Sequence, residues 1–271
     1  MNRHPVVAAR SCAEWTRVAC LGLVLSACAH ATGNPGTSEG APERIGAAWV
    51  ADAGYVRAFA LDAGPTAGVV LIDAGSEGDA ATIRRVLAAM GRTPDAVSTV
   101  LLTHAHLDHV AGLGAFPQAK VMALADEVPL AQGEVEARSP FGRSPLGWFF
   151  RVGKGILISR SLADGETFAI GNLAFRAFAL PGHTDGSAAY ACGDLLFLGD
   201  AAYGNGPARL EGPRWVFSHD VPQGEASLAG LADRLGGVSP APTWLLPSHT
   251  PPVAGMAPLV RWAGQWRSSR R

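Results

Sequence analysis

The chain alternates short apolar runs with turns that are rich in glycine and proline. Apolar runs of four to eight residues, bounded by turn residues, are typical of buried strands. In the first half of the chain such runs predict strands over residues 55–61, 69–73 and 97–102. In the second half they predict strands over residues 167–170, 173–180, 187–191, 195–198 and 244–246.

Three other segments carry apolar residues at helical spacing. The first predicted helix covers residues 79–90 and stops before Gly91, where a helix C-cap is expected. The second covers residues 223–235, with Asp220 as its N-cap, and the third covers residues 256–266. The apolar positions that define the first helix are Ile83, Val86, Leu87 and Met90.

The order of these elements predicts the fold class. Residues 69–102 read strand, helix, strand, which is a βαβ unit of an α/β protein. Residues 120–165 are less regular and suggest a short strand at 120–122 and a short helix at 124–132. The apolar stretch 141–158 allows two interpretations, local core packing or an apolar lid beside a functional site, and the residues alone do not separate them.

The N-terminal segment differs in kind from the rest of the chain. Three arginines precede an apolar run from Val18 to Leu25, and Ser26, Ala27 and Cys28 follow it. This is the order of a secretory signal, and a run of eight residues is shorter than the ~20 that span a bilayer. Leu-Ser-Ala-Cys resembles the lipobox of bacterial lipoproteins.

That resemblance divides the chain into three parts. Residues 1–27 would be a signal peptide, and Cys28 would carry lipid as the first residue of the exported protein. Residues 28–44, rich in small and polar residues, would be a flexible tether, and residues 45–271 would form one domain. Export with lipid anchoring to a membrane is therefore expected, and Ala29 after the cysteine favours the outer membrane.

Charge and cysteine content restrict the partners. The formal net charge is −1 and no long basic run exists, which argues against nucleic acid. Cleavage before Cys28 would leave 19 basic and 22 acidic residues, a balance of −3. It would also leave Cys192 as the only cysteine besides the lipidated one, so no internal disulfide is expected. A small-molecule substrate is the expected partner, and the sequence leaves the oligomeric state open.

The densest chemistry follows the apolar run 97–102. His104, His106, Asp108 and His109 lie within six residues of one another. Three imidazoles and a carboxylate this close would be costly to bury without a partner, whereas a bound cation would satisfy them. Histidine and aspartate suit zinc or another borderline divalent ion.

Three further ligand candidates stand where predicted strands end. His183 follows the strand that ends at Leu180, Asp200 follows Leu198, and His249 follows Leu246. A single histidine at a strand end is more often structural than a ligand. Three such positions, together with the loop at 104–109, favour one shared metal site.

The combined pattern resembles the metallo-β-lactamase superfamily over roughly residues 45–255. This resemblance implies an α/β fold of the αββα type, two mixed β-sheets flanked by helices. It also implies two zinc ions, with iron or manganese as alternatives. One ion would be held by His104, His106 and His183, the other by Asp108, His109 and His249, and Asp200 would bridge them. Asp73 would orient the histidine loop without binding metal itself.

The implied reaction is hydrolysis. A hydroxide held between the ions would attack an ester-like bond, a lactone or a thioester, with no covalent intermediate. Asp108 would be catalytic as well as a ligand. Tyr203, three residues after Asp200, resembles a tyrosine of quorum-sensing lactonases and would donate a hydrogen bond to the developing oxyanion.

Several alternatives stay open on the same fold. Asp200 stands where many β-lactamases of this fold carry cysteine or serine, which makes antibiotic hydrolysis a second choice. Glyoxalase II enzymes share the ligands, but only 22 residues follow His249, fewer than their C-terminal helical region needs. A persulfide dioxygenase with one iron, or a lipoprotein that binds without turnover, is also compatible with the motifs.

Overall fold

The computed structural model describes residues 42–149, 155–206, 208–235 and 238–270. The predicted signal at 1–27, the lipidation site Cys28 and most of the tether lie outside these residues and stay predictions. Within the described part, no helix combines the length and the apolar character that crossing a membrane requires.

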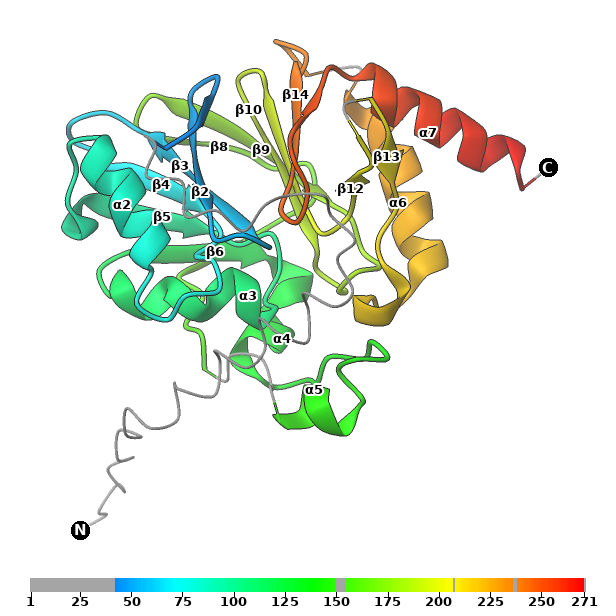
Figure 1. Cartoon of the computed structure of the whole chain (residues 1–271), viewed down its shortest axis with the longest axis horizontal. Coiled ribbons are helices and arrows are strands. Elements are labelled where there is room, and N and C mark those ends of the chain that lie inside the picture. Colours follow the sequence, from blue (N-terminus) through cyan, green and yellow to red (C-terminus); the bar gives the residue numbers. More distant parts are fainter. Residues whose placement is uncertain (1–41, 150–154, 207, 236–237, 271) are drawn as a thin grey trace. The chain divides into compact units, whose positions relative to one another are not determined.

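Two mixed sheets form the centre of the domain (Figure 1). The first has the strand order β1-β2-β3-β4-β5-β6-β7. Its strands are β1 (Arg44–Ile45), β2 (Ala48–Asp52), β3 (Arg57–Asp62), β4 (Val69–Ile72), β5 (Val97–Leu101), β6 (Lys120–Leu124) and β7 (Arg160–Leu162). The pairs from β1 to β4 are antiparallel, and the pairs from β4 to β7 are parallel.

The second sheet has the order β15-β14-β11-β10-β9-β8. Its strands are β8 (Thr167–Ile170), β9 (Leu173–Ala179), β10 (Ala188–Cys192), β11 (Leu195–Gly199), β14 (Trp244–Pro247) and β15 (Val253–Ala254). Only the β11–β14 pair is parallel in this sheet. A separate short ribbon pairs β12 (Tyr203–Gly204) with β13 (Leu210–Glu211).

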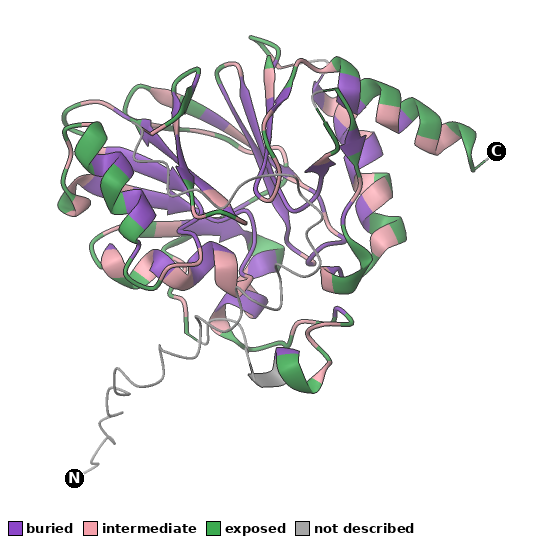
Figure 2. Cartoon of the chain, in the orientation of Figure 1, coloured by how far each residue is buried: buried purple, intermediate pink, exposed green. Residues whose placement is uncertain are grey.

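Helices cover the outer faces of the sheets (Figure 1). The longer ones are α2 (Ala81–Ala89), α6 (Val221–Arg234) and α7 (Ala257–Ser268), and the short ones are α3 (Leu107–Val110), α4 (Val128–Gln132) and α5 (Pro145–Phe149). Single 3-10 turns are η2 (Pro94–Ala96), η3 (Ala111–Ala115), η4 (Ala125–Glu127) and η5 (Trp215–Phe217). The helices are buried toward the sheets and exposed on the other side (Figure 2).

Alternation along the strands divides the core into layers, because successive side chains of a strand point to opposite faces. Between the sheets, Phe59 of β3 packs against Phe197 of β11 with ring centroids 5.2 Å apart. On the outer face of the first sheet, Leu71 packs with Leu87 of α2. On the outer face of the second, Leu196 packs with Leu231 of α6. The predicted αββα sandwich is thereby confirmed.

Strand direction brings the ends of several strands to one edge. The parallel pair β4–β5 ends at Asp73 and the His104 loop, and the parallel pair β11–β14 ends at Asp200 and His249. Strand β9 runs in the same direction as β11, because both are antiparallel to β10 between them. Every chain segment that the sequence selected as a carrier of ligands therefore leaves its sheet at the same edge.

The predicted strand 55–61 was wrong at its start. Strand β3 begins at Arg57, because the Ala53 N–H bonds to the Val56 carbonyl at 3.0 Å and closes a hairpin turn. Tyr55 therefore stands in a turn. The predicted helix 124–132 is likewise divided into the turn η4 and the short helix α4, with Pro129 in the first turn of α4.

The apolar stretch 141–158 contains α5, and its residues 150–154 lie outside the described part. Phe141 packs against Phe217 with ring centroids 5.4 Å apart, whereas Leu157 is 78% exposed. Ile156 and Ile158 pack against the small cluster of Ala105 and α4. Local packing thus accounts for part of the stretch, and the interpretation as a lid stays a prediction.

Candidate metal centre

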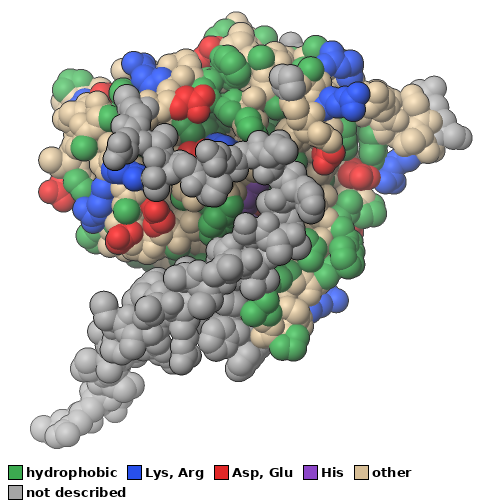
Figure 3. Space-filling view, in the orientation of Figure 1, with side chains coloured by type: hydrophobic (Ala, Val, Ile, Leu, Met, Phe, Trp, Pro, Cys, Tyr) green, Lys and Arg blue, Asp and Glu red, His purple; other side chains and the backbone are tan. Residues whose placement is uncertain are grey.

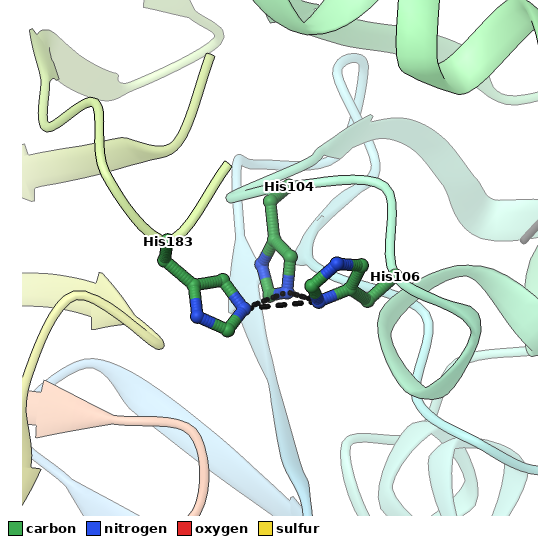
Figure 4. Close-up of side chains that lie close together, drawn as sticks. All are labelled: His104, His106 and His183. Atoms are coloured by element: carbon green, nitrogen blue, oxygen red, sulfur yellow. Dashed lines mark hydrogen bonds between the residues drawn. The ribbon is translucent and has the colours of Figure 1, made fainter. Parts of the chain in front are cut away.

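Three histidines from two separate loops point their rings at one another (Figure 4). His104 Nε2 lies 3.1 Å from His106 Nδ1 and 3.1 Å from His183 Nε2. The third side of the triangle, from His183 Nε2 to His106 Nδ1, is 2.9 Å. Nitrogen ligands that share a tetrahedral zinc ion lie about 3.3 Å apart, so this triangle has nearly the size that such an ion requires.

The surrounding hydrogen bonds fix the protons on two of these rings. Thr103 Oγ1 donates to Asp73 Oδ2 at 2.8 Å, so it accepts from His104 Nδ1 at 3.1 Å. Ser218 Oγ donates to the Arg214 carbonyl at 2.7 Å, so it accepts from His183 Nδ1 at 3.1 Å. Both Nε2 atoms are then unprotonated, and their lone pairs face each other.

At most one proton, on His106 Nδ1, remains to be shared among the three nitrogens. Burial and the neighbouring imidazoles keep the pKa values of His104 and His106 well below the usual range, and burial lowers the pKa of His183 to about 4. Neutral rings with converging lone pairs are the form in which histidine binds metal. This first group of His104, His106 and His183 is therefore suited to one cation.

A second group lies beside the first. His109 donates from Nδ1 to Asp73 Oδ2 at 2.8 Å, which turns its Nε2 toward Asp200 Oδ1 at 3.4 Å. His249 donates from Nδ1 to the Tyr55 carbonyl at 2.5 Å, which turns its Nε2 toward Asp108 Oδ2 at 3.3 Å. Asp108, His109 and His249 thus present one ligand atom each to a common space.

Two atoms in this space lack partners. Among the described residues, His109 Nε2 and Asp200 Oδ1 are buried and make no hydrogen bond, although they face each other. A buried polar atom without a partner costs about 1–3 kcal/mol, and native structures contain few of them. A cation between the two atoms would remove both costs, so the donor set and the orphaned atoms fit a metal.

Asp200 connects the two groups. Its Oδ2 lies 3.1 Å from His249 Nε2 and 3.6 Å from His183 Nε2, so a single carboxylate reaches both. Burial alone would raise the pKa of Asp200, but the positive charges of His249 and His109 hold it well below the usual range. The carboxylate is therefore ionised and available to two cations at once.

The histidines of the second group show the opposite electrostatic pattern. Burial disfavours the charged form of His249, yet Asp200 and Asp108 raise its pKa to about 10. Burial also disfavours the charged form of His109. The negative charges of Asp73, Asp108 and Asp200 nevertheless raise its pKa well above the usual range. Without a metal, both rings therefore take up a second proton at neutral pH.

The approach of the two sheets at this edge depends on Gly199. Its φ of +54° lies in the left-handed region, and a Cβ there would stand 2.7 Å from the Thr103 side chain. Glycine therefore lets the end of β11 pass close to the loop that carries His104. Backbone bonds across the edge hold the approach, including Ala188 N–H to the Thr103 carbonyl at 2.8 Å.

The hydroxyl of Tyr203 faces Asp200, whereas the sequence predicted a contact with the substrate. Its hydroxyl donates to Asp200 Oδ2 at 2.9 Å, and its side chain is buried. Its ring lies nearly parallel to that of His249, with centroids 5.9 Å apart. The single phenol proton is thus used by the carboxylate, and contact with a substrate stays a prediction.

Sequence reasoning missed Glu127, a buried carboxylate at the end of η4. Glu127 accepts from the Ala105 N–H at 2.6 Å, from Thr184 Oγ1 at 2.6 Å and from the Gly186 N–H at 3.1 Å. Burial raises its pKa to about 7, although these three donors oppose the shift. Glu127 therefore ties the loop of His104 and His106 to the loop of His183.

The centre is open on one side. His104, His109 and His183 are buried, whereas the side chains of Asp108 and His249 are 23% and 18% exposed. On the face drawn in Figure 3, the residues that the structure describes show histidine at one place. The partial exposure of Asp108 and His249 gives a small molecule a way to the second group.

Comparisons with known proteins agree with this geometry. The family model described as "Metallo-beta-lactamase superfamily" matches residues 51–249. The probable polyketide biosynthesis zinc-dependent hydrolase BaeB of Bacillus velezensis is 31% identical over 110 residues, 41% of this chain and 41% of that protein. A hydroxyacylglutathione hydrolase of Pseudomonas paraeruginosa is 33% identical over 162 residues, 57% of this chain and 49% of that protein. The alignments thus cover half or less of these two relatives.

Solved structures show the same fold. BJP-1, a subclass B3 metallo-β-lactamase of Bradyrhizobium japonicum, superposes with a TM-score of 0.61 at 18% identity, over 86% of this chain and 93% of that one. SMB-1, another metallo-β-lactamase, gives a TM-score of 0.61 at 24% identity, over 87% of this chain and 97% of that one.

The contacts of Glu127 lead to a stability prediction. Glu127→Ala would leave the Ala105 and Gly186 N–H groups buried without an acceptor, so we expect a loss of about 3 kcal/mol in the free energy of unfolding. Denaturant unfolding of metal-free protein measures this. The matched change Glu166→Ala removes a carboxylate that is paired with Arg160 and accepts the Ala163 N–H at the surface, where water can replace it, so it should cost about 1 kcal/mol. Equal losses in the two variants would contradict the role given to Glu127.

Proposed function

The chain belongs to the metallo-β-lactamase superfamily of hydrolases, and within it we propose a dinuclear zinc enzyme that cleaves an ester-like bond. The observation that carries the proposal is the position of Asp200 between two groups of ligand atoms. His104, His106 and His183 would hold one ion, and Asp108, His109 and His249 would hold the other. Asp200 would contact both.

Divalent ions in such sites ionise a water molecule near pH 7 and polarise the bond to be cleaved. The protein residues would supply the rest. Asp73 fixes the orientation of His109 through its Nδ1, and Thr103, itself bonded to Asp73, fixes that of His104. Asp108 is the more exposed carboxylate of the centre, and we assign it the task of handling the proton at the open side.

A thioester or a lactone is the substrate we favour. Support for a thioester comes from the similarity to hydroxyacylglutathione hydrolases, and support for a lactone from the position of Tyr203 after Asp200. Both substrates present an acyl carbon that hydroxide can attack, followed by departure of a thiolate or an alkoxide. The likeness to β-lactamases lies below 25% identity and concerns the fold, so it does not favour antibiotic hydrolysis.

The direct test is turnover of zinc-loaded protein on a panel of thioesters, lactones, phosphoesters and β-lactams. We expect hydrolysis of a thioester or a lactone, and at least about a 100-fold loss in Asp200→Ala together with loss of bound zinc. Tyr203→Phe should lower kcat at full zinc content if the phenol acts on substrate. A single iron with oxygen uptake, or turnover that survives in Asp200→Ala, would contradict the proposal.

The opposite proton affinities of the two groups predict ordered loading. The rings of the first group are neutral at pH 7, so the first zinc should release fewer protons than the second. His109 and His249 must each lose a proton, so the second zinc should release up to two, and its Kd should weaken by up to about 100-fold per pH unit between pH 8 and pH 6. Titration calorimetry in buffers of different ionisation enthalpy measures this. Equal proton release in both steps would refute it.

A further inference from the structure

A second feature stands next to the metal centre and has no part in binding the ions. A cavity of about 360 Å³ lies between the segment that follows α4 and the segment that leads into α6. Its walls include Arg138, Pro140, Arg143, Trp215, His219 and Pro222. Small-molecule sites in proteins generally measure about 300–1,000 Å³, so the cavity can take a group of a few heavy atoms up to a small ring.

One guanidinium that lines the cavity makes no direct ion pair with the described residues. The guanidinium of Arg138 is paired with Asp185, and the carboxylate of Asp220 accepts the Gln223 N–H at the start of α6. The backbone N–H of Arg143 donates to the Ser139 carbonyl, but its guanidinium has no hydrogen-bond or ion-pair partner among the residues that the structure describes. A free guanidinium in a cavity favours an anion, and its planar fork matches a carboxylate with two hydrogen bonds.

Apolar surface stands beside that charge. Trp215 is 70% exposed, the most exposed aromatic side chain in the described part of the chain. Pro140 and Pro222 add rigid apolar surface, one from each wall of the cavity. An exposed tryptophan next to an unpaired arginine suits a group that has an apolar body and an anionic end.

The cavity is joined to the metal centre through His183. Ser218, in the cavity wall, accepts from His183 Nδ1 at 3.1 Å, and the His219 N–H donates to the His183 carbonyl at 3.0 Å. On the other wall, the Arg138 N–H donates to His219 Nε2 at 2.9 Å. The two walls are therefore held together before any ligand arrives, and one of them is the segment that supports a proposed zinc ligand.

We propose that this cavity is a subsite for a substrate carboxylate, which Arg143 binds while Trp215 covers the apolar part of the acyl group. The inference rests on the proposed hydrolase function for its substrate, and it names the class: acyl compounds with a carboxylate remote from the bond that is cleaved. Binding energy from such a remote group can hold the acyl carbon in place at the ions.

Binding can be tested without turnover. In zinc-loaded protein, the indole N–H signal of Trp215, assigned with Trp215→Phe, is followed by NMR during addition of phenylacetate or of neutral phenylacetamide. We expect saturable shifts with phenylacetate only, and about tenfold weaker binding in Arg143→Gln. The matched variant Arg85→Gln changes a guanidinium on α2 that bonds to Thr82, and it should bind as the parent does. Equal affinity in Arg143→Gln and Arg85→Gln would overturn the proposal.

A kinetic arm separates the subsite from the reaction. A glutaryl thioester carries a terminal carboxylate that the valeryl thioester of the same thiol lacks. The ratio of their kcat/KM values should fall about tenfold in Arg143→Gln and stay unchanged in Arg85→Gln, and an unchanged ratio in Arg143→Gln would count against the subsite. If neither thioester nor any lactone is hydrolysed, the proposed function fails, and the NMR titration still decides whether the cavity binds carboxylates.

Discussion

The metal centre depends on one electrostatic constraint: ring nitrogens whose lone pairs point at one another need a positive charge between them. His104 and His183 face each other through unprotonated nitrogens. Such an arrangement is unfavourable in a buried site unless a cation occupies it. The strand directions, the glycine at position 199 and the carboxylate of Glu127 bring the loops of His104 and His183 together against the repulsion of these nitrogens.

The two groups of ligands differ in the way they would meet a cation. The first consists of neutral imidazoles, whose basicity burial lowers. The second is rich in carboxylates, which raise the basicity of His109 and His249 until protons occupy the place of the metal. Protons therefore compete more strongly with an ion in the second group than with one in the first. The asymmetry arises from the placement of Asp73 and Asp108, which contact His109 and His249, whereas Asp200 reaches both groups.

Most of the strands and all seven candidate ligands could be predicted from the sequence, because both are marked by where the apolar runs end. Apolar runs such as 167–170 end at glycine, and the strand found there has the predicted bounds. The candidate ligands come directly after these runs, so their position in the sequence identifies them. The strands at 44–52 were missed because the segment is rich in alanine, and β7 was missed because Arg160 and Ser161 make it polar. Glu127 could not be found, since two of its three donors are backbone N–H groups, which carry no sequence signal.

The central claim is that seven side chains hold two metal ions at one edge of the sandwich. Crystals of zinc-loaded protein, measured at the zinc absorption edge, test it most directly. The account predicts two anomalous peaks about 3.5–4 Å apart. One should lie within bonding distance of His104, His106 and His183, the other of Asp108, His109 and His249, with Asp200 in contact with both. A single peak, or a second peak away from His109 and His249, would contradict it.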